Sequence, residues 1–389
     1  MAEVLAENPS IQKPWPVLLL SQELGQGGTE RQTVEFAKGL DRSRFSVHVG
    51  CFYSDGFRST ELISLGIPIL QLSIPRWPSF WMAGGAWRLV RYIRRHRIRL
   101  VHTFDTPMNC FAAPIARTFG VPVVLSSQRA SRDLTLRWER AVLRLTDRLA
   151  DAVIVNCGAV RRHLIDDEGV RPEQLRLCHN GLDTVRFRLL TKHRPPPLSD
   201  ASLVVGVVCA LRAEKGLPTL LQAFASVLAG APVSWRSGLR LAVIGSGPMR
   251  APLESLTVQL GIRDRCHFEP STPHVEVWLQ AIDIFVLPSL SEALSNALME
   301  AMACGCAVVA SRVGGNPELV SEGVTGFTFE PGDATALADR IEKLAANEEL
   351  RSRLGAAAAD FVRRGFSLEQ SARRMEEIYM DFLEPGHRL

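Results

Sequence analysis

The sequence lacks several features that would define its class, and each absence excludes one class of protein. No apolar run within the 389 residues reaches the length of about 18 that a membrane-spanning helix requires. Residues 1–16 are polar, acidic and proline-bearing, unlike a secretory signal peptide. The eight cysteines include no CxxC pair, which favours buried thiols in a reducing cytosol over a metal site or a disulfide framework. We therefore expect a cytoplasmic protein with no metal cofactor.

Two binding signatures are also missing. The turn Gly245-Ser246-Gly247-Pro248 is not a GxGxxG fingerprint, because Arg250 occupies the place of the last glycine, so dinucleotide binding is not expected. Residues 1–186 hold 25 Lys and Arg against 18 Asp and Glu, whereas the remainder holds 20 against 23. A basic first half suggests an anionic partner. No nucleic-acid module or aromatic–basic interleaving accompanies this charge, so nucleic acid is not expected as that partner.

The chain does contain a regular alternation of short apolar strands and helices in both halves. This alternation predicts an α/β fold with two Rossmann-like domains, each a doubly wound parallel sheet covered by helices on both faces. Residues 187–201 include three consecutive prolines and break the periodicity, which predicts a linker. The expected domains are therefore residues 1–186 and 202–366. A final helix is expected at about residues 367–385.

Residues 288–326 are the most informative part of the chain. Glu292 follows a short apolar strand, and Glu300 lies eight residues later on the helix that begins after it. A second strand then ends in the turn Gly314-Gly315. Both turns would lie at the carboxyl edge of a parallel sheet, where such sheets bind ligands, and helix N-termini favour anions. The segment therefore predicts a phosphorylated ligand with hydroxyl groups for the carboxylates, such as a sugar nucleotide.

The same segment resembles the E-x7-E signature of the retaining glycosyltransferases of family four, which have the GT-B architecture. Three further motifs support the resemblance and occur in the family's order along nearly the whole chain. Gly27-Gly28-Thr29-Glu30 resembles the first glycine loop, and Asn180-Gly181-Leu182-Asp183 resembles the N-G-[VL]-D turn. Residues 211–216 resemble the R-x-x-K-G phosphate clamp. In the family the terminal helix packs back on the first domain.

The resemblance implies roles for residues on the donor side. Glu292 would contact the transferred sugar, and Glu300 would bind the ribose hydroxyls, since an ionised carboxylate only accepts hydrogen bonds. Arg212 and Lys215 would stabilise the charge on the diphosphate leaving group. The remaining donor contacts would come from backbone amides and glycines, namely Gly27, Gly28, Ala293, Leu294, Ser295 and Asn296.

Each of these interpretations has a plainer alternative. Arg212 and Lys215 could be a solvated surface pair, and Glu300 could be a helix-face charge paired with a neighbour. Gly27 and Gly28 could serve only the geometry of a strand–helix turn. The sequence identifies no enzyme nucleophile. Two mechanisms therefore stay open, namely a covalent double displacement and a direct attack by the acceptor hydroxyl from the face that the diphosphate leaves.

The acceptor side departs from the family's pattern. Many members have a histidine after the fourth strand of the first domain, whereas residues 125–132 of this chain contain none. Gln128, Arg129 and Arg132 could instead meet an acceptor phosphate or acidic sugar, or they could only line the cleft. His102 and Asp105, after the preceding strand, are further candidates for the acceptor side.

Tryptophans stand beside an arginine-rich helix in the first half. Trp77 and Trp81 precede a helix that carries Arg88, Arg91, Arg94, Arg95 and Arg97. This pattern is typical of an element that lies on a membrane surface. The alternative is an ordinary helix with a solvated basic face and tryptophans in the core. A membrane contact would place the protein on the inner face of the cytoplasmic membrane and favour a lipid-linked acceptor.

Taken together, these features predict a retaining, metal-independent glycosyltransferase. It would move a hexose-type sugar from a nucleotide diphosphate sugar to a hydroxyl of a glycan or lipid-linked acceptor, in polysaccharide or glycolipid assembly. One alternative is a sugar-nucleotide epimerase with the same architecture. Another is a non-catalytic module that binds the nucleotide sugar without turnover.

Overall fold

The computed structural model describes residues 13–25, 27–54, 56, 58–130, 132, 135–191 and 193–384. The chain divides into two compact units. The first unit takes the chain up to residue 154, residues 168–176 and the chain from residue 372, and the second takes residues 155–167 and 177–371. The two units therefore interleave along the chain, whereas the sequence predicted a single linker near residues 187–201.

The described residues of the first sheet form seven strands in the order β3-β2-β1-β4-β5-β6-β7. The pairs β3–β2, β2–β1, β1–β4 and β4–β5 are all parallel. Strands of such sheets are covered on both faces and are therefore apolar throughout. The strands are β1 (Trp15–Leu20), β2 (Phe45–Cys51), β3 (Ile69–Gln71), β4 (Leu100–Thr103), β5 (Val123–Gln128), β6 (Ala152–Val155) and β7 (Leu175–Leu177).

Helices connect the strands of the first sheet. Asp105 caps the helix after β4, because its side chain accepts a hydrogen bond from the backbone N–H of Met108. The helices up to β6 are α1 (Gly28–Gly39), α2 (Ser59–Ser64), α3 (Met82–His96), α4 (Thr106–Thr118) and α5 (Arg137–Leu149). The last helix of the chain, α15 (Leu368–Leu383), ends within the first unit, where the hydroxyl of Tyr379 lies 2.7 Å from Nδ1 of His102.

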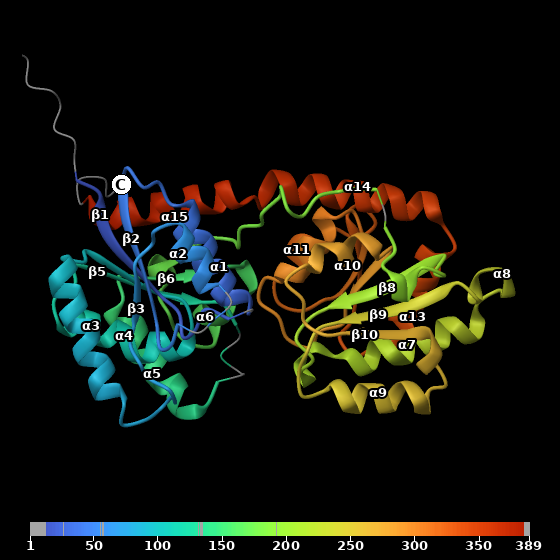
Figure 1. Cartoon of the computed structure of the whole chain (residues 1–389), viewed down its shortest axis with the longest axis horizontal. Coiled ribbons are helices and arrows are strands. Elements are labelled where there is room, and N and C mark those ends of the chain that lie inside the picture. Colours follow the sequence, from blue (N-terminus) through green and yellow to red (C-terminus); the bar gives the residue numbers. More distant parts are fainter. Residues whose placement is uncertain are drawn as a thin grey trace, which may run out of the picture. The chain divides into compact units, whose positions relative to one another are not determined.

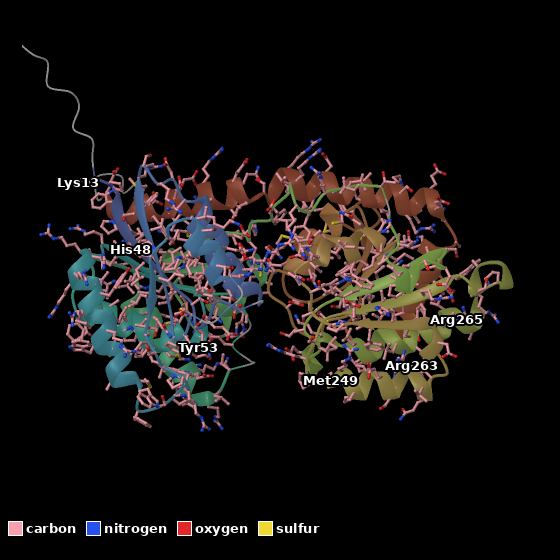
Figure 2. The ribbon with its side chains drawn as sticks, viewed as in Figure 1. Lys13, His48, Tyr53, Met249, Arg263 and Arg265 are labelled. Atoms are coloured by element: carbon pink, nitrogen blue, oxygen red, sulfur yellow. The ribbon has the colours of Figure 1, made fainter. Side chains whose placement is uncertain are left out.

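Helix α3 is anchored to the sheet by its inner face. His48 lies on β2 (Figure 2). Its Nδ1 lies 2.8 Å from the hydroxyl of Tyr92 on α3. Burial and the neighbouring His96 lower the pKa of His48 to about 4, so the imidazole is neutral at pH 7. The exposed residues of α3 include Arg88, Arg91, Arg94 and Arg95.

Trp77 corrects one part of the membrane interpretation. Its ring packs against the rings of Phe52, Phe111 and Trp138, at centroid distances of 5.8, 6.1 and 6.1 Å. This residue therefore belongs to the packed interior beside α3 and not to an exposed surface. Strand and helix periodicity did not reveal it because Trp77 lies in a loop. In the part of the chain that the structure describes, no helix is long and apolar enough to cross a membrane.

The second sheet has six parallel strands within the described residues, in the order β10-β9-β8-β11-β12-β13. The chain starts at β8 in the middle, runs out to β10, and returns to β11 on the other side of β8. The order therefore reverses between β8 and β11. The strands are β8 (Leu203–Val208), β9 (Leu239–Ile244), β10 (Cys266–Glu269), β11 (Ile284–Leu287), β12 (Ala307–Ser311) and β13 (Gly326–Phe329).

Helices cover both faces of the second sheet. Helices α7 and α9 lie on one face, and α10, α11 and α14 lie on the other (Figure 1). The apolar side chains of β8, β9 and β11 pack against those of α7 in a hydrophobic core. The helices of this unit, besides the start of α15, are α6 (Gly158–Asp166), α7 (Leu217–Gly230), α8 (Val233–Arg236), α9 (Arg250–Gln259), α10 (Val275–Ala281), α11 (Asn296–Ala303), α12 (Asn316–Leu319), α13 (Ala334–Ala345) and α14 (Glu348–Gly365).

Candidate functional site

The loops after β8 and β11 meet where the strand order of the second sheet reverses. Parallel sheets of this kind bind ligands at such a point, outside the carboxyl ends of the strands. The backbone N–H of Leu290, after β11, donates to the carbonyl of Glu214, after β8, at 2.8 Å. Gly216 allows this close approach, since its φ is 62° and an added Cβ would lie 2.1 Å from the carbonyl oxygen of Pro288.

Lys215 and Glu292 form an ion pair across these two loops. The Nζ of Lys215 lies 2.6 Å from Oε1 of Glu292, and both side chains are largely buried. The hydroxyl of Ser289 donates to the same carboxylate oxygen at 2.9 Å. Lys215 and Glu292 are 77 positions apart in the chain, and both were predicted as site residues. The structure brings their side chains together. Ser289 was not predicted, although its place two residues after the end of an apolar strand is a signal that could have identified it.

Arg212 stands at the start of the same loop but faces outward. Its side chain is 65% exposed, and its nearest acidic group is the carboxylate of Glu214 at 4.0 Å. Such a side chain can swing to a ligand without breaking an internal contact. The structure thus supplies one cation held by a carboxylate, Lys215, and one exposed cation, Arg212.

Helix α11 begins beside Glu292. The side chain of Ser295 caps this helix by accepting from the backbone N–H of Leu298 at 3.3 Å. The first turn of a helix carries backbone N–H groups that have no partner within the helix and a partial positive charge. The predicted donor contacts Ala293, Leu294 and Asn296 adjoin this turn. The segment can therefore bind an anionic group such as a phosphate.

Glu300 lies on α11, one turn after Asn296. It is only 4% exposed, and Leu298, Met299, Ala301 and Met302 around it are also buried. Burying a charged carboxylate is costly unless hydrogen-bond donors satisfy it. The position is therefore unusual for a surface charge and suits a group that binds hydroxyls.

A glycine turn supports the Glu292 loop from the other side. The backbone N–H of Gly315 donates to the carbonyl of Ala293 at 2.7 Å. Gly314 has a φ of 53°, and an added Cβ would lie 2.0 Å from the carbonyl oxygen of Glu292. Only glycine fits there, because a side chain would push directly on the backbone of the residue that carries the site's carboxylate.

We expect Gly314→Ala to destabilise the protein by about 2–4 kcal/mol, from left-handed backbone strain plus the clash. The matched control is Gly323→Ala, where φ is also positive, at 71°, but no atom lies within 4 Å of the added Cβ. That variant should lose only about 1 kcal/mol. Equal losses in urea unfolding would show that the close approach to Glu292 contributes nothing.

The glycine loop of the first unit lies at the start of α1. Gly27 is the N-cap residue, and an added Cβ would lie 2.1 Å from Oε2 of Glu30. Burial raises the pKa of Glu30 to about 7, with smaller contributions from Asp105 and Glu23. Asp105 accepts from the backbone N–H of Gln22 at 2.5 Å and from the hydroxyl of Ser21 at 3.1 Å, and burial raises its pKa to about 6. Asp105 therefore links the C-terminal end of β1 to the start of α4.

The other predicted acceptor residues have internal partners. His102 is fully buried, and its Nε2 lies 2.8 Å from the hydroxyl of Ser127 while Tyr379 occupies Nδ1. Burial, and secondarily the charge of Arg129, lowers the pKa of His102 well below its usual range. An acceptor contact would require the imidazole to leave a partner, and the acceptor role of His102 stays a prediction.

Gln128, Arg129 and Arg132 also have partners within the first unit, and their acceptor role stays a prediction. Arg132 is buried and makes a bidentate pair with Asp147 at 2.7 and 2.8 Å. Gln128 donates to the carbonyl of Ala130 at 2.7 Å. The guanidinium of Arg129 lies over the rings of Phe36 and Phe104, at 5.5 and 5.1 Å from their centroids. The sequence could not show the packing of Arg129, because Phe36 and Phe104 are distant in the chain.

No group of three or more His, Cys, Asp and Glu side chains in the described ranges is placed to hold a metal ion.

Comparison with known proteins gives matches over most of the chain. The profile of glycosyltransferase family 4 matches residues 26–186, and that of the glycosyl transferases group 1 matches residues 191–361. The chain is similar to N-acetyl-alpha-D-glucosaminyl L-malate synthase of Bacillus anthracis, with 26% identity over 82% of this chain and 83% of that protein. It is also similar to D-inositol 3-phosphate glycosyltransferase of Thermobifida fusca, with 32% identity over 73% of this chain and 70% of that one.

The fold also matches solved structures. The Anabaena protein HepE, solved in complex with UDP-glucose, superposes with a TM-score of 0.81 at 23% identity, covering 94% of this chain and 99% of that one. At this identity the likeness concerns the fold.

Proposed function

Since the chain belongs to the glycosyltransferases of family 4, which have the GT-B fold, we propose that it moves a hexose-type sugar with retention of configuration. The donor would be a nucleoside diphosphate sugar, and the acceptor a hydroxyl of a glycan or a lipid-linked sugar. The observation that carries this proposal is the Lys215–Glu292 pair, which lies at the switch point of the second sheet beside the start of α11.

The site's groups match the parts of such a donor. The diphosphate would lie against the first turn of α11, where Lys215 and Arg212 can neutralise its charge. Glu292 would accept hydrogen bonds from sugar hydroxyls, and Glu300 from the ribose hydroxyls. Lys215 faces Glu292 at 2.6 Å, so the cation for the diphosphate and the carboxylate for the sugar lie side by side.

The reaction follows from these placements. As the bond between the anomeric carbon and the phosphate oxygen breaks, negative charge builds up on the diphosphate, and the fixed cations and amides stabilise it. The acceptor oxygen forms its bond to the anomeric carbon from the face that the diphosphate leaves. Its proton passes to a phosphate oxygen, and the products are the glycoside and the nucleoside diphosphate. Every role here is filled by these side chains, the helix amides and the donor itself, so we expect turnover to persist in EDTA.

A turnover assay tests this proposal. The full chain is incubated with UDP-glucose, GDP-mannose or ADP-glucose, and released nucleoside diphosphate and sugar are followed by NMR. Retaining transfer is supported if an α-linked donor is hydrolysed slowly and the sugar is released first as its α-anomer. An epimerised nucleotide sugar would instead support the epimerase, and binding without any turnover would support the binding module.

Small acceptors form a second candidate class. The two relatives above are named for L-malate and for D-inositol 3-phosphate. Both are small hydroxyl compounds that carry acidic groups, and the first half of this chain is basic. Screening hydroxy acids and polyol phosphates beside lipid-linked sugars distinguishes the two classes, since only the true acceptor accelerates donor consumption.

Contact with an anionic membrane is part of the proposal. Phe80, Trp81 and Trp87 are 81%, 51% and 61% exposed, which is unusual for large aromatic side chains. The guanidinium of Arg91 lies 5.1 Å from the ring centroid of Trp87. Aromatic side chains with arginines suit the interface of a bilayer with negative headgroups. The protein would then work on the cytoplasmic side of the membrane.

We expect the triple change of Phe80, Trp81 and Trp87 to Ser to reduce flotation with phosphatidylglycerol vesicles by about tenfold or more. Removing an aromatic side chain from water is worth roughly 1.5–3 kcal/mol, and 1.4 kcal/mol is tenfold in affinity. Ile63→Ser is the control, because Ile63 is 66% exposed in the same unit but outside α3. Equal flotation of both variants, or none by the wild type, would refute the membrane contact.

A further inference from the structure

Three asparagine side chains form a chain of hydrogen bonds within the second unit. Nδ2 of Asn156 donates to Oδ1 of Asn180 at 3.3 Å. Nδ2 of Asn180 donates in turn to Oδ1 of Asn296 at 2.8 Å. Asn156 and Asn180 are both buried. Buried amides that are hydrogen-bonded in series fix one another's orientation.

Asn180 reaches the start of α11 by two bonds. Besides its bond to Asn296, its Nδ2 donates to the backbone carbonyl of Leu294 at 3.2 Å. Leu294 and Asn296 flank the capping residue Ser295. One side-chain amide therefore holds the backbone before the helix cap and the side chain after it. The bond also turns the oxygen of the Asn296 amide toward Asn180.

The opposite side of the same loop is held separately. The carbonyl of Ala293 accepts from the backbone N–H of Gly315, whereas the neighbouring carbonyl of Leu294 accepts from Asn180. The two bonds thus hold two successive carbonyls of the loop that carries Glu292, and neither bond is part of α11 itself.

We propose that Asn180 is a positioning residue for the nucleotide-sugar donor. It sets the direction of the first amides of α11, and of the Glu292 loop, without touching the donor. This inference rests on the proposed function for the identity of the ligand. The sequence identified Asn180-Gly181-Leu182-Asp183 only as a turn that resembles a family motif. The inference gives this turn a role in the site.

The chemistry requires asparagine. An aspartate at 180 has the same shape and could still accept from Asn156, but it has no N–H for the carbonyl of Leu294 or the oxygen of Asn296. Asn180→Asp therefore replaces two attractive contacts by two repulsive ones without creating a cavity. Asn180→Ala removes all three contacts.

We expect both variants to lower kcat/KM for the donor by about 10- to 100-fold, since misplacement on the order of 1 Å can cost 10²-fold. The donor KM should rise and kcat should fall, whereas the acceptor KM should not change. The control is Asn347→Ala, which removes the cap of α14, a bond of 2.8 Å to the backbone N–H of Leu350. That variant should lose stability but keep the kinetics of the wild type.

Hydrogen exchange gives a readout that does not need activity. In Asn180→Asp, amides of residues 292–300 should exchange about tenfold faster or more, while those of α13 keep their rates. Wild-type exchange at residues 292–300 in both variants would overturn the inference, as would wild-type kcat/KM. If the wild type turns over no nucleotide sugar, the proposed function fails, and the exchange rates still decide the role of Asn180.

Discussion

An Arg212→Ala variant is expected to turn over its donor about 10²–10³ times more slowly than the wild type, and to unfold at almost the same temperature. The guanidinium is exposed, and its nearest acidic neighbour lies at 4.0 Å. Such a side chain contributes little to folding, since surface substitutions change stability by about 0.5 kcal/mol or less. The loss of the Arg212 guanidinium should therefore affect only the reaction step in which negative charge develops on the leaving diphosphate.

Two further variants make this test specific. Arg212→Lys should have an intermediate rate, because lysine keeps the charge but not the planar fork that matches a phosphate. Arg363→Ala is the matched control, since Arg363 is also an exposed arginine and pairs with Asp360 at 2.6 Å on α14. Turnover is measured as released nucleoside diphosphate at saturating donor. Full activity of Arg212→Ala would exclude Arg212 from the phosphate clamp.

The second large effect is expected for Glu300→Gln. An ionised carboxylate can accept from both hydroxyls of a ribose, and hydrogen bonds to charged groups are worth roughly 1.5–3 kcal/mol each. Replacing the carboxylate by an amide should raise the Kd of the nucleoside diphosphate by about 10- to 100-fold. The side chain is nearly isosteric and lies in a packed helix, so the fold should be retained.

A deoxy nucleotide identifies the ribose contact. The wild type should bind the 2′-deoxy forms of UDP, GDP and ADP more weakly than the ribose forms, whereas Glu300→Gln should discriminate much less. Glu349→Gln, an exposed glutamate at the start of α14, is the control for loss of charge. The same discrimination in wild type and Glu300→Gln would place the ribose elsewhere.

The sequence predicted those parts of the molecule that depend on local patterns. The final helix, expected at about residues 367–385, is α15 (Leu368–Leu383) in the structure. The alternation of elements predicted two parallel sheets. The rule for their carboxyl edges placed Glu292 at a ligand site, and the resemblance to the family's phosphate clamp added Lys215. Their ion pair confirms that they meet.

Contacts between segments that are distant in the chain could not be predicted from the sequence. His102 has an ordinary place near the end of strand β4, but its partner Tyr379 is 277 residues away. Asn180 contacts Asn296 across 116 residues. Neither pairing leaves a periodic signal, because each depends on how elements far apart in the chain pack together. The candidates for the acceptor side are residues of this kind, so their partners could not be predicted from the sequence.

A calorimetric titration of the full chain with UDP, GDP and ADP tests most directly whether the switch point of the second sheet is a nucleotide-sugar site. We expect one of the three to bind with a stoichiometry of one. Glu300→Gln should weaken that binding by about 10-fold or more, and Glu349→Gln should not change it. If a folded wild-type protein binds none of the three, or if Glu300→Gln binds as tightly as the wild type, the assignment of this site to a nucleotide sugar is contradicted.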